Sequence, residues 1–529
     1  MSQDPVTHIS ILRKLCRIPS KSCQREETAR VGITSHHQLL AKTQSACFTA
    51  ALLDSKCNST TPHRSLFIID NMAEVTPPMF EDEQLDAQGQ NVRLSRLYTQ
   101  LCLCFPLNGM EPESLSHLHR YLEDGLKRLT MSFPWVAGHV VDEDSVFKIK
   151  PSGRFPALLV KDLRTQLPPF CEYQAKGFPF HMLDEDVIAP RKTLPERFDE
   201  PASVLLVQAN LVDGGALLVV NGQHNCMDMH GQAQIIHLLA KACCNEGYTE
   251  EELRLGNLPR ADIIPVLETE DSPSAQPTLP HETAGVDSGT SLQDSHTKLQ
   301  CTWAYFLFSQ SALVELKALA VKSMTADYVS TDDALSALIW QAVTRTRLAR
   351  FDSRTVTSTF DRQVDARRHL DTPPAYTGNV VHKVSSTLPM HHILDMPLGV
   401  LASHLRTSLQ STDIAHEVRR AATKAHQATS ASRSQSSQHN SGTTRGTLPP
   451  TDIRMSSWAK EDCYHVDFGG LLGKPEAVRR PNFPAWEGLV YLLPKKLDGE
   501  IAIALCLREE DMEELKGDDT FTRFCSYIV

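Results

Sequence analysis

One histidine and one aspartate, four residues apart, are the side chains in this sequence that best suit acid–base chemistry. A histidine accepts a proton near neutral pH and returns it later in the same cycle, because its ordinary pKa is about 6.5. An acidic residue four positions on can fix the backbone or the ring without reacting itself. We therefore expect His224 to be a general base supported by Asp228, within the segment Asn221-Gly222-Gln223-His224-Asn225-Cys226-Met227-Asp228-Met229-His230-Gly231.

Three other interpretations of this segment are open. A metal site would use His224, Asp228 and His230, but the sequence shows no further cluster of ligands to complete it. A thiol nucleophile would use Cys226, two residues after the histidine. A single histidine can also be purely structural.

Two elements would position the pair. Residues 216–220 form a small apolar run that is typical of a buried strand. Residues 232–244 carry apolar side chains at helical spacing, at Ile235, Ile236, Leu238 and Leu239. The histidine and the aspartate would thus lie at a strand-to-helix junction, where side chains can point into a cleft.

A second motif lies near the C-terminus and makes the first more specific. It consists of Ser456-Ser457-Trp458 followed by Asp467-Phe468-Gly469-Gly470-Leu471-Leu472-Gly473-Lys474-Pro475. Together with the pattern H-x-x-x-D-x-x-G at His224, Asp228 and Gly231, it resembles the BAHD acyltransferase superfamily. The later box lacks the tryptophan of the plant members and is two residues longer, a form similar to the fungal trichothecene 3-O-acetyltransferase branch. Further family-like stretches are Pro134-Trp135-Val136-Ala137-Gly138, Val364-Asp365-Ala366-Arg367-Arg368 and Tyr376-Thr377-Gly378-Asn379-Val380.

The resemblance implies an α/β fold of two similar chloramphenicol-acetyltransferase-like domains, with an active-site channel at their interface. It implies that His224 is the catalytic base and that Asp228 pairs with Arg367 in a structural role beside Gly231. Ser457 and Trp458 are expected to line the acyl or acceptor pocket, with the indole N–H as a candidate donor to the oxyanion. Asp467 and Gly469 are expected to shape the CoA side, because a glycine-rich turn offers no acid–base group.

The implied function is an acyl-CoA-dependent O-acyltransferase acting on a hydroxyl of a fungal secondary metabolite such as a terpenoid or mycotoxin. Acetyl-CoA would be the co-substrate, and neither a bound cofactor nor a metal is required. N-acylation of an amine and a catalytically inactive, metabolite-binding relative remain alternatives. The family resemblance also suggests a monomer.

Composition and charge fit a small-molecule enzyme. The chain has 529 residues, which exceeds what one core normally organises, so two domains with a cleft between them are expected. A net charge of −11 without a long basic run disfavours nucleic acid and anionic membrane as partners. The 14 cysteines have no metal-binding spacing and are expected to be reduced thiols of a cytoplasmic protein.

Shifts in composition suggest the domain boundaries. Residues 1–71 show no sustained apolar period and are expected to be a disordered extension, or to precede a true start at Met72. The acyltransferase domains would span 72–267 and 301–529, joined by a crossover linker at 268–300. A serine-rich stretch at 427–450 would be a disordered loop.

Three further elements can be predicted from the apolar pattern. Residues 97–107 indicate a strand, and residues 112–130 an amphipathic helix. A helix is also expected over 331–350, capped by Ser330 or Thr331. Its late arginines, Arg345, Arg347 and Arg350, would suit the negative end of the helix dipole.

Overall fold

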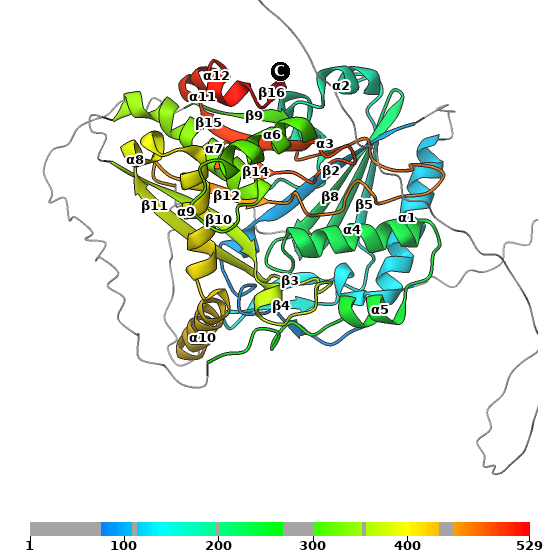
Figure 1. The fold of residues 1–529 in the computed structure, drawn as a ribbon. Coiled ribbons are helices and arrows are strands. Elements are labelled where there is room, and N and C mark those ends of the chain that lie inside the picture. The colour runs from blue at the N-terminus through cyan, green and yellow to red at the C-terminus, as the bar shows by residue number, and fades with distance from the viewer. Residues whose placement is uncertain are drawn as a thin grey trace, which may run out of the picture. The chain divides into compact units, whose positions relative to one another are not determined.

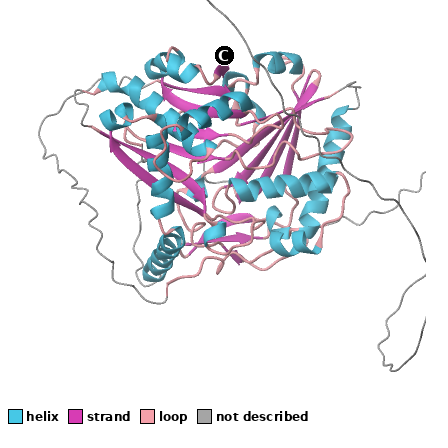
Figure 2. Cartoon of the chain, viewed as in Figure 1, coloured by secondary structure: helices cyan, strands magenta, loops and turns pink. Residues whose placement is uncertain are grey.

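The computed structural model describes residues 76–107, 114–195, 201–267, 300–351, 356–432 and 448–528. These ranges form mixed helices and strands, with three sheets in the described part of the chain (Figure 1, Figure 2). The predicted extension 1–71, most of the predicted linker and the centre of the predicted loop at 427–450 lie outside the described residues. None of the described helices is long and apolar enough to cross a membrane.

The sheets are built from strands that are distant in sequence. The five-stranded sheet has the order β13 (Ala477–Arg479), β2 (Tyr98–Pro106), β8 (Gly215–Gln223), β7 (Leu205–Val212) and β5 (Ala157–Asp162). The seven-stranded sheet has the order β11 (Val381–Pro389), β10 (Thr357–Asp365), β12 (Ile453–Ser457), β14 (Leu489–Leu492), β15 (Ile501–Arg508), β9 (Cys301–Phe308) and β16 (Ser526–Ile528). The four-stranded sheet has the order β1 (Glu83–Gln84), β4 (Val146–Lys150), β3 (His139–Glu143) and β6 (Ala202–Ser203).

The helices pack on these sheets. The α-helices are α1 (Ser114–Ser132), α2 (Phe170–Lys176), α3 (Glu185–Ile188), α4 (Met229–Cys243), α5 (Glu250–Gly256), α6 (Gln310–Val321), α7 (Thr331–Arg347), α8 (Met390–Asp395), α9 (Leu398–Ser411), α10 (Ile414–Ser432), α11 (Glu509–Lys516) and α12 (Asp519–Thr522). Short 3-10 helices are η1 (Leu94–Arg96), η2 (Pro134–Ala137), η3 (Phe180–Met182), η4 (Leu348–Arg350) and η5 (Arg367–His369).

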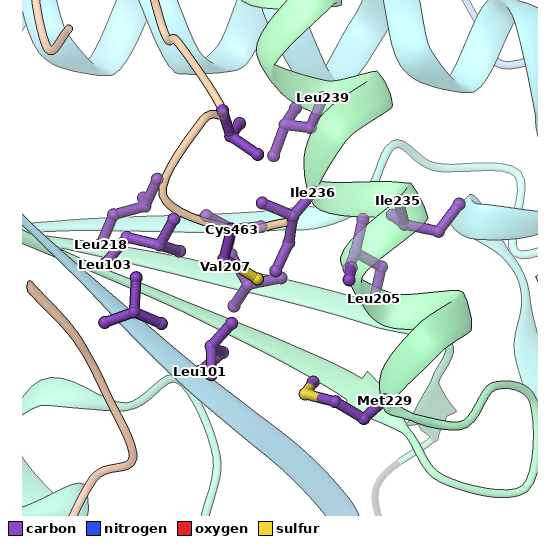
Figure 3. Close-up of a cluster of buried hydrophobic side chains, with 14 of the residues drawn as sticks. Leu101, Leu103, Leu205, Val207, Leu218, Met229, Ile235, Ile236, Leu239 and Cys463 are labelled. Atoms are coloured by element: carbon purple, nitrogen blue, oxygen red, sulfur yellow. The ribbon is translucent and has the colours of Figure 1, made fainter. Parts of the chain in front are cut away.

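Helix α4 covers one face of the five-stranded sheet and thereby fixes the segment that leads into it. Its inner face packs Ile235, Ile236 and Leu239 over strands β2, β7 and β8 (Figure 3). The side chains of β2 point alternately to the two faces of the sheet, and both faces are buried. Leu101 and Leu103 belong to this core, whereas Cys102 and Cys104 belong to a second buried cluster on the other face. The thiols thus fill apolar positions.

The predicted elements are largely confirmed. The strands expected at 97–107 and 216–220 are β2 and β8, and the helix expected at 112–130 is α1. Ser330 caps α7 and forms a capping box with Asp333. Helix α4 begins at Met229, earlier than expected, because the Asp228 side chain caps it by accepting from the Gly231 N–H.

The arginines expected near the negative end of α7 are there, with Arg345 and Arg347 in its last turn, and one loop boundary differs from expectation. The arginines at the end of α7 do more than face the helix dipole: Arg347 is fully buried and donates to the Asp452 carbonyl at 3.0 Å, while Arg350 pairs with Glu487 and Asp511, each at 2.8 Å. The loop predicted at 427–450 begins later, since α10 continues to residue 432 through an alanine-rich sequence that favours helix.

The two predicted domains share a sheet. Strand β13 belongs to the C-terminal half of the chain, yet it pairs with β2 of the N-terminal half, Val478 lying opposite Leu103. The boundaries at 72–267 and 301–529 and the channel between these domains stay predictions.

Candidate active site

His224 directly follows strand β8 and is held by its own backbone. Its N–H donates to the Leu97 carbonyl at 2.9 Å, which continues the pairing of β8 with β2 by one residue. The ring Nδ1 lies 3.2 Å from the Met227 carbonyl oxygen. A carbonyl can only accept, so Nδ1 carries the proton and the lone pair lies on Nε2. This is the tautomer that a general base needs.

The environment of the ring keeps it neutral. Burial is the largest influence on the pKa of His224 and lowers it below the ordinary value. The Met227 carbonyl and the Asp228 carboxylate oppose this shift, whereas the positive charge of Arg480 adds to it. His224 is therefore unprotonated at neutral pH and is ready to accept a proton.

Asp228 does not point at the reacting centre but holds the loop that carries His224. It is buried and caps α4 by accepting from the Gly231 N–H at 2.8 Å. It also accepts from the Val380 N–H at 3.0 Å and pairs with both terminal nitrogens of Arg367, at 2.9 and 3.0 Å. Burial alone would raise the pKa of Asp228, but the Arg367 charge and these hydrogen bonds outweigh it and lower the pKa. The expected ion pair is present, and Asp228 is ionised.

Arg367 joins the two parts of the site. Besides Asp228, its guanidinium donates to Asp365 at 2.9 Å and to the carbonyls of Tyr376 and Gly378 at 3.1 and 2.8 Å. All five N–H donors of this buried side chain are thus used. The loop at 376–380 is fixed against the segment that carries His224.

Gly231 is required by close packing and not by a special backbone angle. A Cβ built at this position would lie far inside van der Waals contact of the Thr377 carbonyl. Only glycine lets the first turn of α4 approach the loop this closely. The glycine of the H-x-x-x-D-x-x-G pattern therefore packs α4 against the loop at 376–380, the same loop that Asp228 binds through the Val380 N–H.

Several residues of the site were not singled out individually from the sequence. Asn379 donates its side-chain N–H to the His224 carbonyl at 2.9 Å, and its backbone N–H donates to Asp86 at 3.2 Å. Asp86 is fully buried, and burial is the main cause that raises its pKa to about 6. Asn379 could have been found from the sequence, because it lies in the family-like stretch at 376–380. No motif near Asp86 indicated the role of that residue.

Trp458 differs from expectation in the direction of its polar group. The indole N–H donates to the Ser456 hydroxyl at 2.9 Å, so it already has a partner and is not directed at an oxyanion. The side chain is buried, and its ring lies 4.9 Å from that of Tyr491. Ser457, the last residue of β12, is partly exposed.

Asp467 and Gly469 lie far from His224. The Cys244 thiol donates to the Asp467 carbonyl at 3.5 Å, and Cys244 follows the C-terminal end of α4, whereas His224 precedes the N-terminal end. A helix of 15 residues is roughly 22 Å long, so the turn does not reach the reacting atoms. Gly469 has a φ of 77°, a conformation that favours glycine, and the Asp467 carboxylate accepts from its N–H at 2.9 Å.

The alternative chemistries find little support in the geometry. Cys226 is completely buried, and burial raises the pKa of its thiol well above the ordinary value, which opposes thiolate formation. Both ring nitrogens of His230 already have partners, the Glu461 carboxylate at 3.0 Å and the Pro374 carbonyl at 2.6 Å. Within the described ranges no group of three or more His, Cys, Asp or Glu could hold a metal ion.

Comparison with known proteins identifies the family of this chain. Residues 97–243 match the trichothecene 3-O-acetyltransferase-like N-terminal domain. The O-acetyltransferase dmxR13 of Cryptosporiopsis sp. (strain 8999) is 45% identical over 464 residues, covering 84% of this chain and 98% of the relative. Trichothecene 3-O-acetyltransferase TRI101 of Fusarium sporotrichioides is 41% identical, covering 84% of this chain and 97% of the relative.

Solved structures show the same fold. The crystal structure of F. sporotrichioides TRI101 complexed with coenzyme A and T-2 has a TM-score of 0.73 and 40% identity, covering 85% of this chain and 100% of that one. Vinorine synthase, at 17% identity and a TM-score of 0.59 over 85% of this chain and 95% of that one, shares the fold.

These likenesses and the site define an acyltransferase that uses an acyl-CoA co-substrate. The α/β fold expected from the motifs is confirmed. Within this class the chain belongs to the trichothecene 3-O-acetyltransferase-like family.

Proposed function

We propose that this enzyme transfers an acetyl group from acetyl-CoA to a hydroxyl of a fungal secondary metabolite, with His224 as the general base. The observation that carries the proposal is the contact of His224 Nδ1 with the Met227 carbonyl, which leaves Nε2 as the basic atom. Terpenoid acceptors are the first choice, since a related TRI101 structure is complexed with deoxynivalenol.

In the proposed reaction Nε2 of His224 removes the proton of the acceptor hydroxyl as its oxygen attacks the thioester carbonyl carbon. The resulting tetrahedral oxyanion collapses, the carbon–sulfur bond breaks, and the CoA thiolate leaves. The imidazolium of His224 then returns the proton to that thiolate. Neither a covalent acyl-enzyme nor a metal takes part in these steps.

The other residues are assigned supporting roles. Asp228, Arg367 and Gly231 hold the catalytic loop through their mutual contacts. Ser457 and Trp458 line the pocket, and Asp467 with Gly469 shapes the CoA side. A cytoplasmic monomer with acyltransferase domains at 72–267 and 301–529 completes the proposal.

The test is to incubate the purified protein with acetyl-CoA and a panel of hydroxylated terpenoids and their amine counterparts. Free thiol and product mass are followed, with His224→Ala as the control for contaminating activity. CoA release with a product one acetyl heavier, which mild alkali cleaves as an ester, is expected for the hydroxylated acceptors only. Alkali-stable products from the amines would indicate N-acylation, and binding of acceptors without CoA release would indicate an inactive relative.

A further inference from the structure

A short segment far from His224 in the sequence lies against the catalytic loop. This segment, residues 83–91, is called the strap below. One end is fixed to the four-stranded sheet, because β1 pairs with β4 and the Leu85 N–H donates to the Phe147 carbonyl at 3.1 Å. Further along, the Gln88 side chain donates to the Val381 carbonyl of β11 at 2.6 Å. The strap is therefore anchored on two different sheets.

The strap reaches His224 through Asn379. The Asn379 side chain donates to the His224 carbonyl at 2.9 Å, and the Asn379 backbone N–H donates to the Asp86 carboxylate at 3.2 Å. Asp86 is buried and also accepts from the Gly89 N–H at 2.7 Å and from the Tyr376 hydroxyl at 3.4 Å. Asp86 thus ties the strap to the residue that holds the backbone of the catalytic base.

The strap also touches Asn225, the residue that follows the base. The Asn225 side chain donates to the Gly89 carbonyl at 3.4 Å. A Cβ built on Gly89 would lie 2.6 Å from the Asn225 carbonyl oxygen, which is closer than a side chain can approach. Only glycine lets the strap pack so tightly on the backbone of the catalytic loop.

Arg260 connects the strap to Cys226, the next residue of the loop. Its buried guanidinium pairs with Glu83 of the strap at 2.8 Å and lies 3.9 Å from the ring centroid of Trp135. From there Nε donates to the Cys226 carbonyl and Nη2 to the Thr377 hydroxyl, each at 3.4 Å. These two hydrogen bonds are long, but the ion pair and the ring keep the guanidinium beside the loop.

These contacts differ from those of the Asp228–Arg367 pair. That pair fixes the first turn of α4, whereas the strap acts on three consecutive residues, 224–226, which include the base itself. A general base works only within hydrogen-bond reach of the proton that it removes, so the position of this backbone matters for the rate.

We propose that the strap positions the catalytic base: Asp86 holds His224 through Asn379, Gly89 seats Asn225, and Arg260 holds Cys226. This inference rests on the proposed function, in which His224 is the base. Asp86 and Arg260 are positioning residues, since they act on His224 through other groups.

The first experiment needs neither acyl-CoA nor acceptor and therefore does not depend on the proposed function. Hydrogen–deuterium exchange is followed by mass spectrometry in the full-length wild type and in Asp86→Asn, for peptides that cover residues 224–227. The amides of residues 224, 226 and 227 are suitable reporters, because each donates to a backbone carbonyl.

Asp86→Asn is expected to speed exchange in residues 224–227 by about 10-fold. The new amide has one accepting oxygen where the carboxylate has two, so the N–H of either Gly89 or Asn379 loses its acceptor. A buried donor without an acceptor is costly, and the loop that depends on it opens more often. Unchanged exchange would overturn the proposal.

Asp333→Asn is the matched control. Asp333 is also a buried carboxylate, but it pairs with Arg362 and Arg406 in the part of the chain around α7. Its loss breaks a buried ion pair away from the strap and is expected to leave exchange in residues 224–227 at the wild-type rate. Equal acceleration in both variants would show a general loosening of the fold and would also overturn the proposal.

A second pair of variants leaves every charge in place. Gly89→Ala is expected to speed exchange in residues 224–227, because its Cβ would push the strap off the Asn225 carbonyl. Gly247→Ala has open space around the added Cβ and is expected to behave like the wild type. Wild-type exchange in Gly89→Ala would refute the contact between the strap and the loop.

The second experiment measures turnover with an acceptor found active. Asp86→Asn is expected to lower kcat by about 10²-fold, the cost typical of a base displaced by a fraction of its reach, with KM for acetyl-CoA and for the acceptor close to the wild-type values. Asp333→Asn is expected to keep the wild-type kcat per folded molecule. A raised KM with normal kcat would show that the strap shapes a binding site and would refute the positioning role. Lack of turnover by the wild type would count against the proposed function alone, because the exchange experiment still decides whether the strap holds the loop.

Discussion

Replacing Asp228 by asparagine is expected to destabilise the protein strongly, although the change is nearly isosteric. Asp228 and Arg367 are each only 2% exposed and share two hydrogen bonds at 2.9 and 3.0 Å. The variant leaves Arg367 buried with only Asp365 as a charged partner, and an uncompensated buried charge typically costs about 3–5 kcal/mol. The amide can still cap α4 through its oxygen, so this cost reports the ion pair more than the cap.

A double-mutant cycle measures this coupling. Free energies of unfolding from urea denaturation are compared for the wild type, Asp228→Asn, Arg367→Met and the double variant. The double variant is expected to cost less than the sum of the single variants by at least about 2 kcal/mol, because it leaves neither charge unpaired. Strictly additive costs, or a loss below about 1 kcal/mol for Asp228→Asn, would refute the claim that the pair holds the loop.

Two further predictions concern the same loop. Gly231→Ala should lower the melting temperature and the activity, because the added Cβ would collide with the Thr377 carbonyl. Gly247→Ala is the control and should change neither, because the space around Gly247 is open. Equal melting temperatures for the two variants would contradict the packing argument. His230 is half-buried, and burial acts to lower its pKa, but the hydrogen bond to Glu461 outweighs burial and raises the pKa. The stability that this pair contributes is therefore fully present below the pKa of an unfolded histidine, about 6.5. It is lost as the pH rises through the higher pKa of His230 in the folded protein. Urea midpoints measured across that range should converge for the wild type and His230→Asn at higher pH, and a constant difference between them would contradict the assignment.

The sequence could predict the elements of the site where the signal was local. The apolar run of β8, the helical spacing of α4 and the H-x-x-x-D-x-x-G pattern between them identified His224, Asp228 and Gly231. The partner of Asp228 lies 139 residues away and was predicted only through the family resemblance. Long-range pairing of this kind depends on the fold, which a single sequence does not specify residue by residue.

Other features left no signal in the sequence. The proton on Nδ1 of His224 is set by a backbone carbonyl, a group that every residue has. Trp458 was expected to turn its N–H to the oxyanion, but Ser456, two residues before it, accepts that hydrogen bond.

The central claim is that a neutral His224 is the base, and the most direct test is the pH dependence of kcat/KM for acetyl transfer in the wild type and in His224→Ala. Because burial lowers the pKa of His224, the wild-type rate should stay constant down to about pH 6.5 and fall below it. The variant should lose about 10²–10⁴-fold and show no such acid limb. A variant that kept the wild-type rate, or the same acid limb, would contradict the assignment of His224 as the base.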